Sequence, residues 1–173
     1  MTLEYQFGED IADRQRFHEI LNEWNPHVPT YEQFELELRN AQDGIAAVLV
    51  DGMPGFLLRT VLLPISDVSD LAYIGDIDAL TGNQTWSTYD SKGKTRVMVD
   101  FTNSEGMRGR HLAHPILGEL LKIYWDRSEH IETTTPVAAE ELHRRHNAEA
   151  RLGLINFRPN YPKSRNAIVM VYK

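Results

Sequence analysis

A short glycine-containing segment between a strand-like run and a helix-like run constrains this chain more than any other feature. Residues 96–101 read as an apolar strand, and residues 116–125 carry apolar side chains at helical spacing. The segment 108–113, Arg-Gly-Arg-His-Leu-Ala, therefore leads from a strand into a helix. The first amides of a helix have no intrahelical acceptor, and the helix dipole is positive at that end. The sequence predicts an anion site here that suits a phosphate or a diphosphate.

The order of the other elements predicts the fold class. Periodicity and turn residues indicate, in the first part of the chain, a strand at 3–7, a helix ending near Trp24, a helix from Thr30, and strands at 45–50 and 55–63. In the second part they indicate a strand at 96–101, a helix at 116–125, a strand at 131–135 and a helix from 138 through 150 toward Gly153. A short extra strand and a last strand at 167–172 complete the order. Antiparallel pairing at the start gives way to β-α-β connections later. We therefore expect the α/β (α+β) class, with a mixed, mostly antiparallel sheet and helices on both faces.

Two local patterns set boundaries within this order. Thr30 and Gln33 form a capping-box pattern at the start of the second helix. Asp51 and Gly52 are a strong hairpin signal, so the strands on either side should pair antiparallel. Residues 66–93 show no periodicity and are rich in Asp, Ser, Gly, Asn and Thr. We expect one domain over residues 1–173, with an irregular insertion at about 66–93.

Composition excludes several classes of site and partner. The chain has no cysteine, which excludes disulfides, thiolate nucleophiles and cysteine-based zinc sites. A formal net charge of −7 lacks the basic character that generic nucleic-acid binding needs. No apolar run approaches a membrane-spanning length and the N-terminus shows no secretory signal. We therefore expect a cytoplasmic protein without nucleic-acid or membrane partners.

Two pairs of histidines have a spacing that metal ligands can use. His111 with His114, and His143 with His146, each have the spacing of two ligands on one helix face. No third histidine or carboxylate completes a metal-binding signature, so no metal site is predicted.

Four places in the chain carry a resemblance to a known family. Residues 51–57, Asp-Gly-Met-Pro-Gly-Phe-Leu, form a hairpin turn that leads into a Gly-Phe strand, and residues 108–113 begin with arginine and end with alanine. Asn147 precedes two candidates for a Leu-Gly-Phe motif, at 152–154 and 155–157, and residues 157–159 lead through a turn into the last strand. Together with the element order, these places make nearly the whole chain resemble the GNAT superfamily of acyl-CoA-dependent N-acyltransferases.

The resemblance implies where an acyl-CoA cofactor, acetyl-CoA above all, would bind. Its diphosphate would contact the loop residues Arg108, Gly109, Arg110, His111, Leu112 and Ala113. His111 stands where the family has glycine. An alternative register puts Gly109 at that position, but it leaves His114 and Pro115 where apolar helix residues are expected, so we favour the first register.

The resemblance also implies a place for the pantetheine arm of the cofactor. In the family, the fourth and fifth strands splay apart, and the arm lies in the gap. Phe101, Thr102 and Asn103 would line that gap here. Asn147, on the helix expected from 138 through 150, would contact the cofactor.

The candidate catalytic residues depart from the family pattern. The family's usual carboxylate on the fourth strand falls near Val97, and the nearest acid on that strand is Asp100. The family's usual tyrosine is replaced by Glu149 or Leu152, and Tyr161 is the only phenol nearby. Asp100 and Tyr161 are therefore the candidate base and acid, although a hydrogen-bonded strand residue and a surface turn residue are the simpler interpretations.

Three functions compete on this evidence. The first is an N-acetyltransferase that acts on a primary amine of a small molecule or peptide, with a homodimer as a possible state because dimers are frequent in the family. The second is a catalytically degenerate GNAT-fold protein that serves as a CoA-binding or regulatory module, motivated by His111 and the missing acid and base. A dinucleotide-binding oxidoreductase fits poorly, because its glycine fingerprint should follow the first strand of a βαβ unit.

Overall fold

A seven-stranded sheet in the order β1-β2-β3-β4-β5-β7-β6 forms the centre of the protein. In the computed structural model, the described residues are 1–24, 30–40, 43–63, 95–157 and 165–173. The strands are β1 (Leu3–Phe7), β2 (Ile45–Val50), β3 (Met53–Leu63), β4 (Thr95–Asn103), β5 (His130–Pro136), β6 (Ala148–Phe157) and β7 (Arg165–Tyr172). The pair β4–β5 is parallel and the other pairs are antiparallel. The predicted mixed, mostly antiparallel sheet is confirmed.

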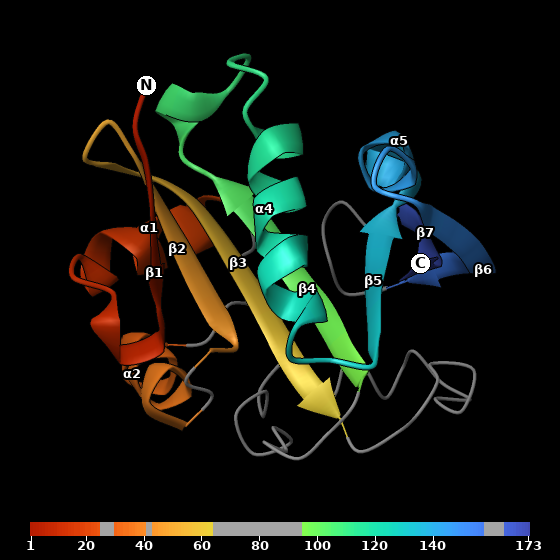
Figure 1. Cartoon of the computed structure of the whole chain (residues 1–173), viewed down its shortest axis with the longest axis horizontal. Helices are drawn as coiled ribbons and strands as arrows, with labels where there is room; N and C mark the ends of the chain where they lie inside the picture. The colour runs from red at the N-terminus through yellow and green to blue at the C-terminus, as the bar shows by residue number, and fades with distance from the viewer. Residues whose placement is uncertain (25–29, 41–42, 64–94, 158–164) are drawn as a thin grey trace.

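Helices cover both faces of this sheet, as predicted (Figure 1). The α-helices of the described part are α1 (Arg14–Trp24), α2 (Tyr31–Asn40), α4 (Ala113–Trp125) and α5 (Glu140–Arg144). One core lies between α4 and the sheet, and the other lies between the sheet and the pair α1 and α2. β2 is apolar throughout because Ala46 and Val48 join the first core, whereas Ile45 and Ala47 join the second. No helix in the described ranges is long and apolar enough to span a membrane.

Both local boundary predictions are confirmed. The Gln33 amide donates to Thr30 Oγ1 over 3.3 Å, and the Thr30 amide donates to Gln33 Oε1 over 2.8 Å, which is the reciprocal capping box. Asp51 and Gly52 both have positive φ, 51° and 79°, as a type I′ hairpin turn requires, and β2 and β3 pair antiparallel around them.

The expected long helix before the last strands is wrong. The helix α5 has 5 residues, and β6 begins at Ala148, so Ala150 and Gly153 lie in a strand. Both candidate Leu-Gly-Phe tripeptides also lie in β6. Pairing with β7 makes this segment a strand and not a helix. From Ala148 onward, β6 forms an antiparallel ladder with β7, and a helix could not make these pairs.

A buried arginine fixes the lower end of β4 against α4. Arg96 lies 4.3 Å above the ring centroid of Tyr124, and its Nη1 donates to Thr60 Oγ1 over 2.8 Å. Its Nη2 is 3.3 Å from Asp43 Oδ2, and the Tyr124 hydroxyl donates to the Asp43 carbonyl oxygen over 3.1 Å. These contacts hold the strand and the helix that flank the predicted anion loop in one fixed relation.

Candidate cofactor and acceptor site

β4 and β5 stop pairing about halfway along β4. Their parallel pairing runs from Thr95 with His130 to Met98 with Thr133, where the Thr133 hydroxyl donates to the Met98 carbonyl oxygen over 3.4 Å. On its other edge β5 pairs with β7 from Glu132 to Pro136, and β4 continues past Met98 to Asn103 paired only with β3 among the described strands. The sheet therefore opens into a V-shaped gap on the β5 side of β4, and Figure 1 shows α4 and α5 standing on either side of its mouth.

The residues predicted to line this gap lie beyond its vertex. Phe101, Thr102 and Asn103 pair with Leu58, Leu57 and Phe56 of β3 on the closed side. The ring of Phe101 stacks on that of Phe56 at 5.8 Å, on the α4 side of the sheet. These three residues therefore turn the edge of an extended strand toward the gap.

The loop after β4 ends in a helix start without a cap. The α4 helix begins at Ala113, and no side chain caps it. In the described part of the chain, the amides of Gly109, His111, Leu112, Ala113 and His114 have no acceptor, whereas Arg108 and Arg110 amides bond back to Glu105 and Met107. Side chains at 108–111 are exposed and Leu112 is buried. Unpaired amides at the positive end of α4 suit a diphosphate.

His111 occupies a backbone conformation that favours glycine. Its φ is 55°, and the φ of Gly109 is 71°. The left-handed region costs a residue with a Cβ about 1–2 kcal/mol, which is a physical reason for glycine at this position in the family pattern. The His111 side chain is exposed, so the imidazole does not fill the loop.

Asp100 belongs to a buried ion triad on the α2 side of the sheet. Arg59 Nη1 is 2.9 Å from Asp100 Oδ2, and Arg59 Nε is 3.1 Å from Glu37 Oε2. The Arg59 and Glu37 side chains are 2% and 4% exposed, and that of Asp100 is 9% exposed. Val99 is the extra residue of a bulge in β4, since Arg59 pairs with Asp100 but Thr60 pairs with Met98. The bulge sets Asp100 opposite Arg59, at the vertex of the gap.

Thr102 carries an unsatisfied hydroxyl on the same face. Its Oγ1 is buried and has no hydrogen-bond partner among the described atoms. Thr102 pairs with Leu57, which belongs to the α1 and α2 core, so its side chain shares that face with Asp100. Leaving a buried hydroxyl unpaired costs about 1–3 kcal/mol, and a ligand donor or acceptor would recover it.

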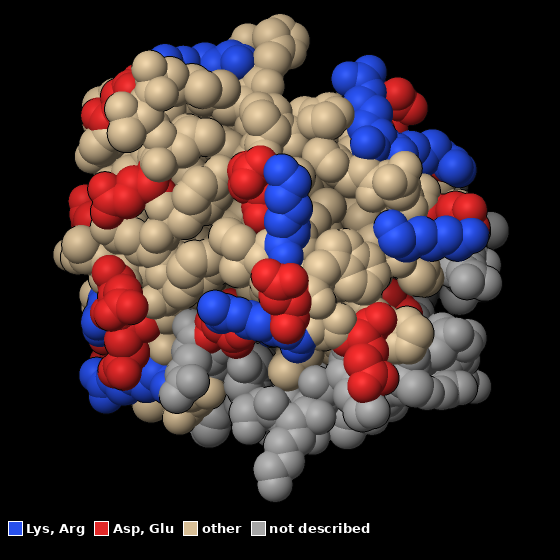
Figure 2. Space-filling view, in the orientation of Figure 1, with Lys and Arg blue, Asp and Glu red and all other residues tan. Residues whose placement is uncertain are grey.

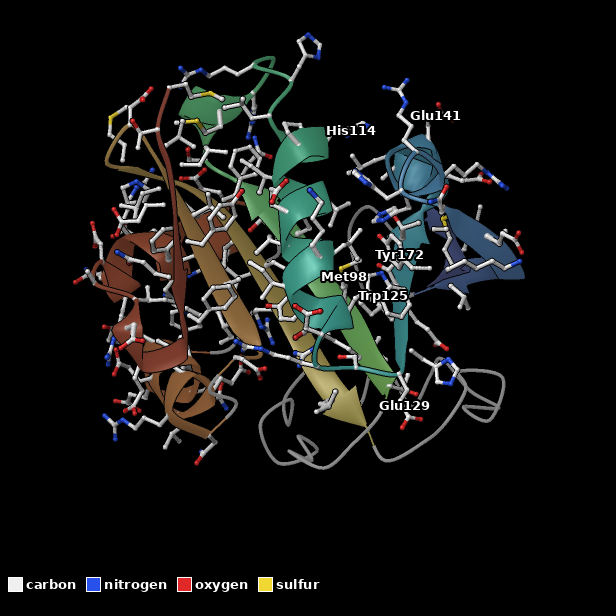
Figure 3. All side chains as sticks on the ribbon, viewed as in Figure 1. Met98, His114, Trp125, Glu129, Glu141 and Tyr172 are labelled. Carbon is white, nitrogen blue, oxygen red and sulfur yellow. The ribbon has the colours of Figure 1, made fainter. Side chains whose placement is uncertain are left out.

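Three histidines and a tyrosine line the junction between α4 and the C-terminal strands, and Figure 3 labels two of them, His114 and Tyr172. The rings of His114 and His146 have centroids 4.3 Å apart, and His143 Nδ1 forms a short hydrogen bond with the Tyr172 hydroxyl. Burial, and then the neighbouring His146, lower the pKa of His143 to about 4. Burial raises the pKa of Tyr172, so the phenol stays protonated beside the imidazole. Nowhere in the described part do three such ligands gather around a possible metal position.

Asn147 lies in a turn and not on a helix, contrary to the expectation. Its φ is 62°, its amide donates to the Arg144 carbonyl oxygen over 3.1 Å, and its carbonyl oxygen accepts from the Lys173 amide over 3.2 Å. Its side chain is exposed and lines a surface pocket with Arg144 and Lys173. Figure 2 shows basic side chains gathered over α5, beside this turn. Tyr161 lies outside the described residues, as does the whole of the predicted 66–93 insertion.

Comparison with known proteins identifies the fold. No family model and no curated protein matches the sequence. The loading GNATL domain of CurA from Lyngbya majuscula aligns with a TM-score of 0.76 and 9% identity, over 100% of this chain and 98% of that chain. Naa50 from Arabidopsis thaliana, in complex with the bisubstrate analogue CoA-Ac-MVNAL, aligns at 0.66 and 9% identity, over 100% and 99%. The GphF GNAT-like decarboxylase with isobutyryl-CoA aligns at 0.64 and 10% identity, over 99% and 98%.

This chain has the GNAT fold, as the resemblance predicted. The solved structures that share it include proteins crystallised with CoA derivatives and a protein named a decarboxylase. The fold therefore defines the class of architecture, and the reaction has to be argued from the site.

The sequence alone did not reveal the partners of Asp100 or the contact between His114 and His146, which lie far apart in the chain. Glu37 and Arg59 lie 22 positions apart in the sequence. An arginine within the apolar run of β3 was a usable signal, because a buried guanidinium needs carboxylates nearby. The contact between His114 and His146 had no such signal, since it depends on how α4 docks beside α5.

Proposed function

We propose that this protein is an acyl-CoA-dependent N-acyltransferase that moves an acetyl group from acetyl-CoA to a primary amine of a small molecule or peptide. The observation that carries the proposal is the gap between β4 and β5, open beside a helix start with unpaired amides. An extended pantetheine arm can pair with a strand edge, and a diphosphate can accept hydrogen bonds from helix-start amides. The two features adjoin in the chain, since β4 ends at Asn103 and α4 begins at Ala113.

The proposed binding residues follow from this placement. The edge of Phe101, Thr102 and Asn103 would hold the pantetheine arm, and the loop Arg108, Gly109, Arg110, His111, Leu112 and Ala113 would hold the diphosphate. The exposed guanidinium groups of Arg108 and Arg110 add positive charge to that loop. Asn147 and the pocket around it would meet the cofactor from the α5 side.

The transfer needs an oriented amine and two proton transfers. The amine nitrogen forms a bond to the thioester carbonyl carbon, the carbon–sulfur bond breaks, the amine loses a proton and the CoA thiolate gains one. Asp100, at the vertex of the gap, would attract the amine and take its proton directly or through water, while Arg59 holds the carboxylate in place. Tyr161 is the proposed proton donor to the thiolate.

A second function is favoured by the same ion triad. Because Arg59 Nη1 already binds Asp100 Oδ2, this carboxylate is engaged in an ion pair before any amine approaches it. A catalytically degenerate protein that binds CoA, and that serves as a regulatory or interaction module, is therefore the alternative.

Two measurements separate these functions. The first is thermal unfolding with and without acetyl-CoA at about a hundredfold over its dissociation constant, which adds about 2.7 kcal/mol and raises the midpoint by about 5–10 °C. The second is release of CoA thiol in the presence of a panel of primary amines. A shift with thiol release supports the transferase, a shift without release supports the binding module, and no shift contradicts both.

A matched pair of variants tests the role of Asp100. Asp100→Asn should reduce thiol release, while Asp126→Asn, an exposed acid at the end of α4, should leave it unchanged. Equal rates in the two variants would remove Asp100 from the chemistry.

A further inference from the structure

Two imidazole rings, those of His114 and His146, connect α4 to the turn before β6. His114 lies in the first turn of α4, and Figure 3 shows it on the side of that helix that faces α5. His146 comes from the turn between α5 and β6, and its ring lies against Gly118, where an added Cβ would be 3.0 Å from His146 Cε1. The absence of a side chain at Gly118 therefore lets His146 reach α4 and pack beside His114.

Among the described residues, the only charge that shifts the pKa of His146 is that of His114. His143 from α5 is the next titratable group, since the charge of His146 acts on it, and it bonds to Tyr172 of β7. Burial lowers the pKa of His146, the charge of His114 lowers it further, and a hydrogen bond to the His114 backbone raises it. None of the charges that act on His143 or His146 within the described residues is a carboxylate. The nearby Arg144 and Arg145 are paired with Glu140 and Glu141.

One polar atom of this pair lacks a partner. His146 Nε2 is buried and has no hydrogen-bond partner in the described part of the chain. His114 directly follows Ala113, so it is itself one of the helix-start residues whose amides lack acceptors. An anion bound at those amides would lie against the pair and would supply the counter-charge that it lacks.

We propose that His114 and His146 form a proton-linked wall of the anion site, and that binding the diphosphate of CoA makes this pair take up a proton. The inference rests on the proposed function, because it takes the ligand from there. Two rings in contact repel each other when both are charged, so one shared proton is the expected stoichiometry. By linkage, a ligand that favours the protonated pair binds more tightly as the pH falls, by up to about tenfold per pH unit at full coupling.

The probe is 3′-dephospho-CoA, because a phosphate monoester itself titrates near pH 6 whereas the diphosphate diester does not. Titration calorimetry at several values between about pH 6 and about pH 8, in two buffers of different ionisation enthalpy, gives the affinity and the number of protons taken up. The wild-type protein should take up as much as about one proton and should bind more tightly at the lower pH.

Variants assign the proton to this pair. His114→Gln and His146→Gln should each reduce the proton uptake and flatten the pH dependence of affinity. His130→Gln, at the far end of β5 where His130 pairs with Thr95, is the matched control and should behave as the wild type. Circular dichroism melts establish that each variant is folded, and if one is not, the other variant carries the test.

The outcomes distinguish this inference from the proposed function. Binding without proton uptake, or uptake that persists in both glutamine variants, overturns the inference and leaves the proposed function standing. No binding of 3′-dephospho-CoA or of acetyl-CoA at any pH overturns both.

Discussion

Acidification should destabilise this protein through His143. The side chain is 5% exposed, and its pKa is lowered to about 4, by burial first and by His146 second. In the unfolded chain the same imidazole titrates near pH 6.5. Because the folded pKa is the lower one, the unfolded state binds the proton first as the pH falls. The contribution of this group to the free energy of unfolding is therefore present above about pH 6.5 and is lost as the pH falls toward about 4.

The size of this effect follows from the interval between the two pKa values. Each pKa unit is worth about 1.4 kcal/mol, so the full effect is about 3 kcal/mol, of which about 2 kcal/mol is lost between about pH 7 and about pH 5. For a chain of this length, that loss lowers the melting midpoint by about 4–8 °C. Carboxylates that pair in the folded state add to the loss mainly at lower pH, so the comparison must be made against a variant.

The assay is urea unfolding, followed by circular dichroism, at about pH 7, about pH 6 and about pH 5. His143→Asn places an amide, which can both donate and accept, near the position where Nδ1 bonds to the Tyr172 hydroxyl, and it removes the titrating group. The variant should be less stable than the wild type at about pH 7, and its stability should fall less by about 2 kcal/mol on going to about pH 5. His130→Gln should follow the wild type. Parallel pH profiles for wild type and His143→Asn would refute the reasoning.

Three further variants test the site. His111→Gly should raise the free energy of unfolding by about 1 kcal/mol, because the φ of 55° strains a residue with a Cβ, and calorimetry should find acetyl-CoA binding intact or tighter; lost affinity would make His111 a phosphate contact. Thr102→Val should leave the free energy of unfolding unchanged or raise it by up to about 1 kcal/mol while slowing thiol release, and a clear loss of stability would mean that the hydroxyl has a partner in the folded protein. Arg59→Met should lower the free energy of unfolding by about 3–5 kcal/mol, because Glu37 and Asp100 remain in place without their cation; a loss below about 1 kcal/mol in urea unfolding would count against a buried ion triad.

Local sequence signals predicted the elements whose ends are decided locally. The capping box at Thr30 and Gln33 and the hairpin at Asp51 and Gly52 are both present as expected, because a few neighbouring backbone groups determine each of them. The strand at 96–101 and the helix at 116–125 were also predicted within a few residues. The segment from Glu140 to Phe157 was predicted wrongly, because most of it forms β6 in spite of its helical spacing. Its conformation depends on pairing with β7, a later segment that a local pattern does not include.

The sequence by itself determined the order of strands and helices, the strand-loop-helix transition before Ala113 and the absence of cysteine chemistry, since each of these depends on residue type and short-range spacing. Only the tertiary structure decided where β4 leaves β5, that Asp100 is bound by Arg59, and that His146 meets His114 across Gly118. These features arise from contacts between segments far apart in the chain. Their energies depend on burial and on distances of a few ångströms between segments, and the residue spacing within one segment determines neither of these.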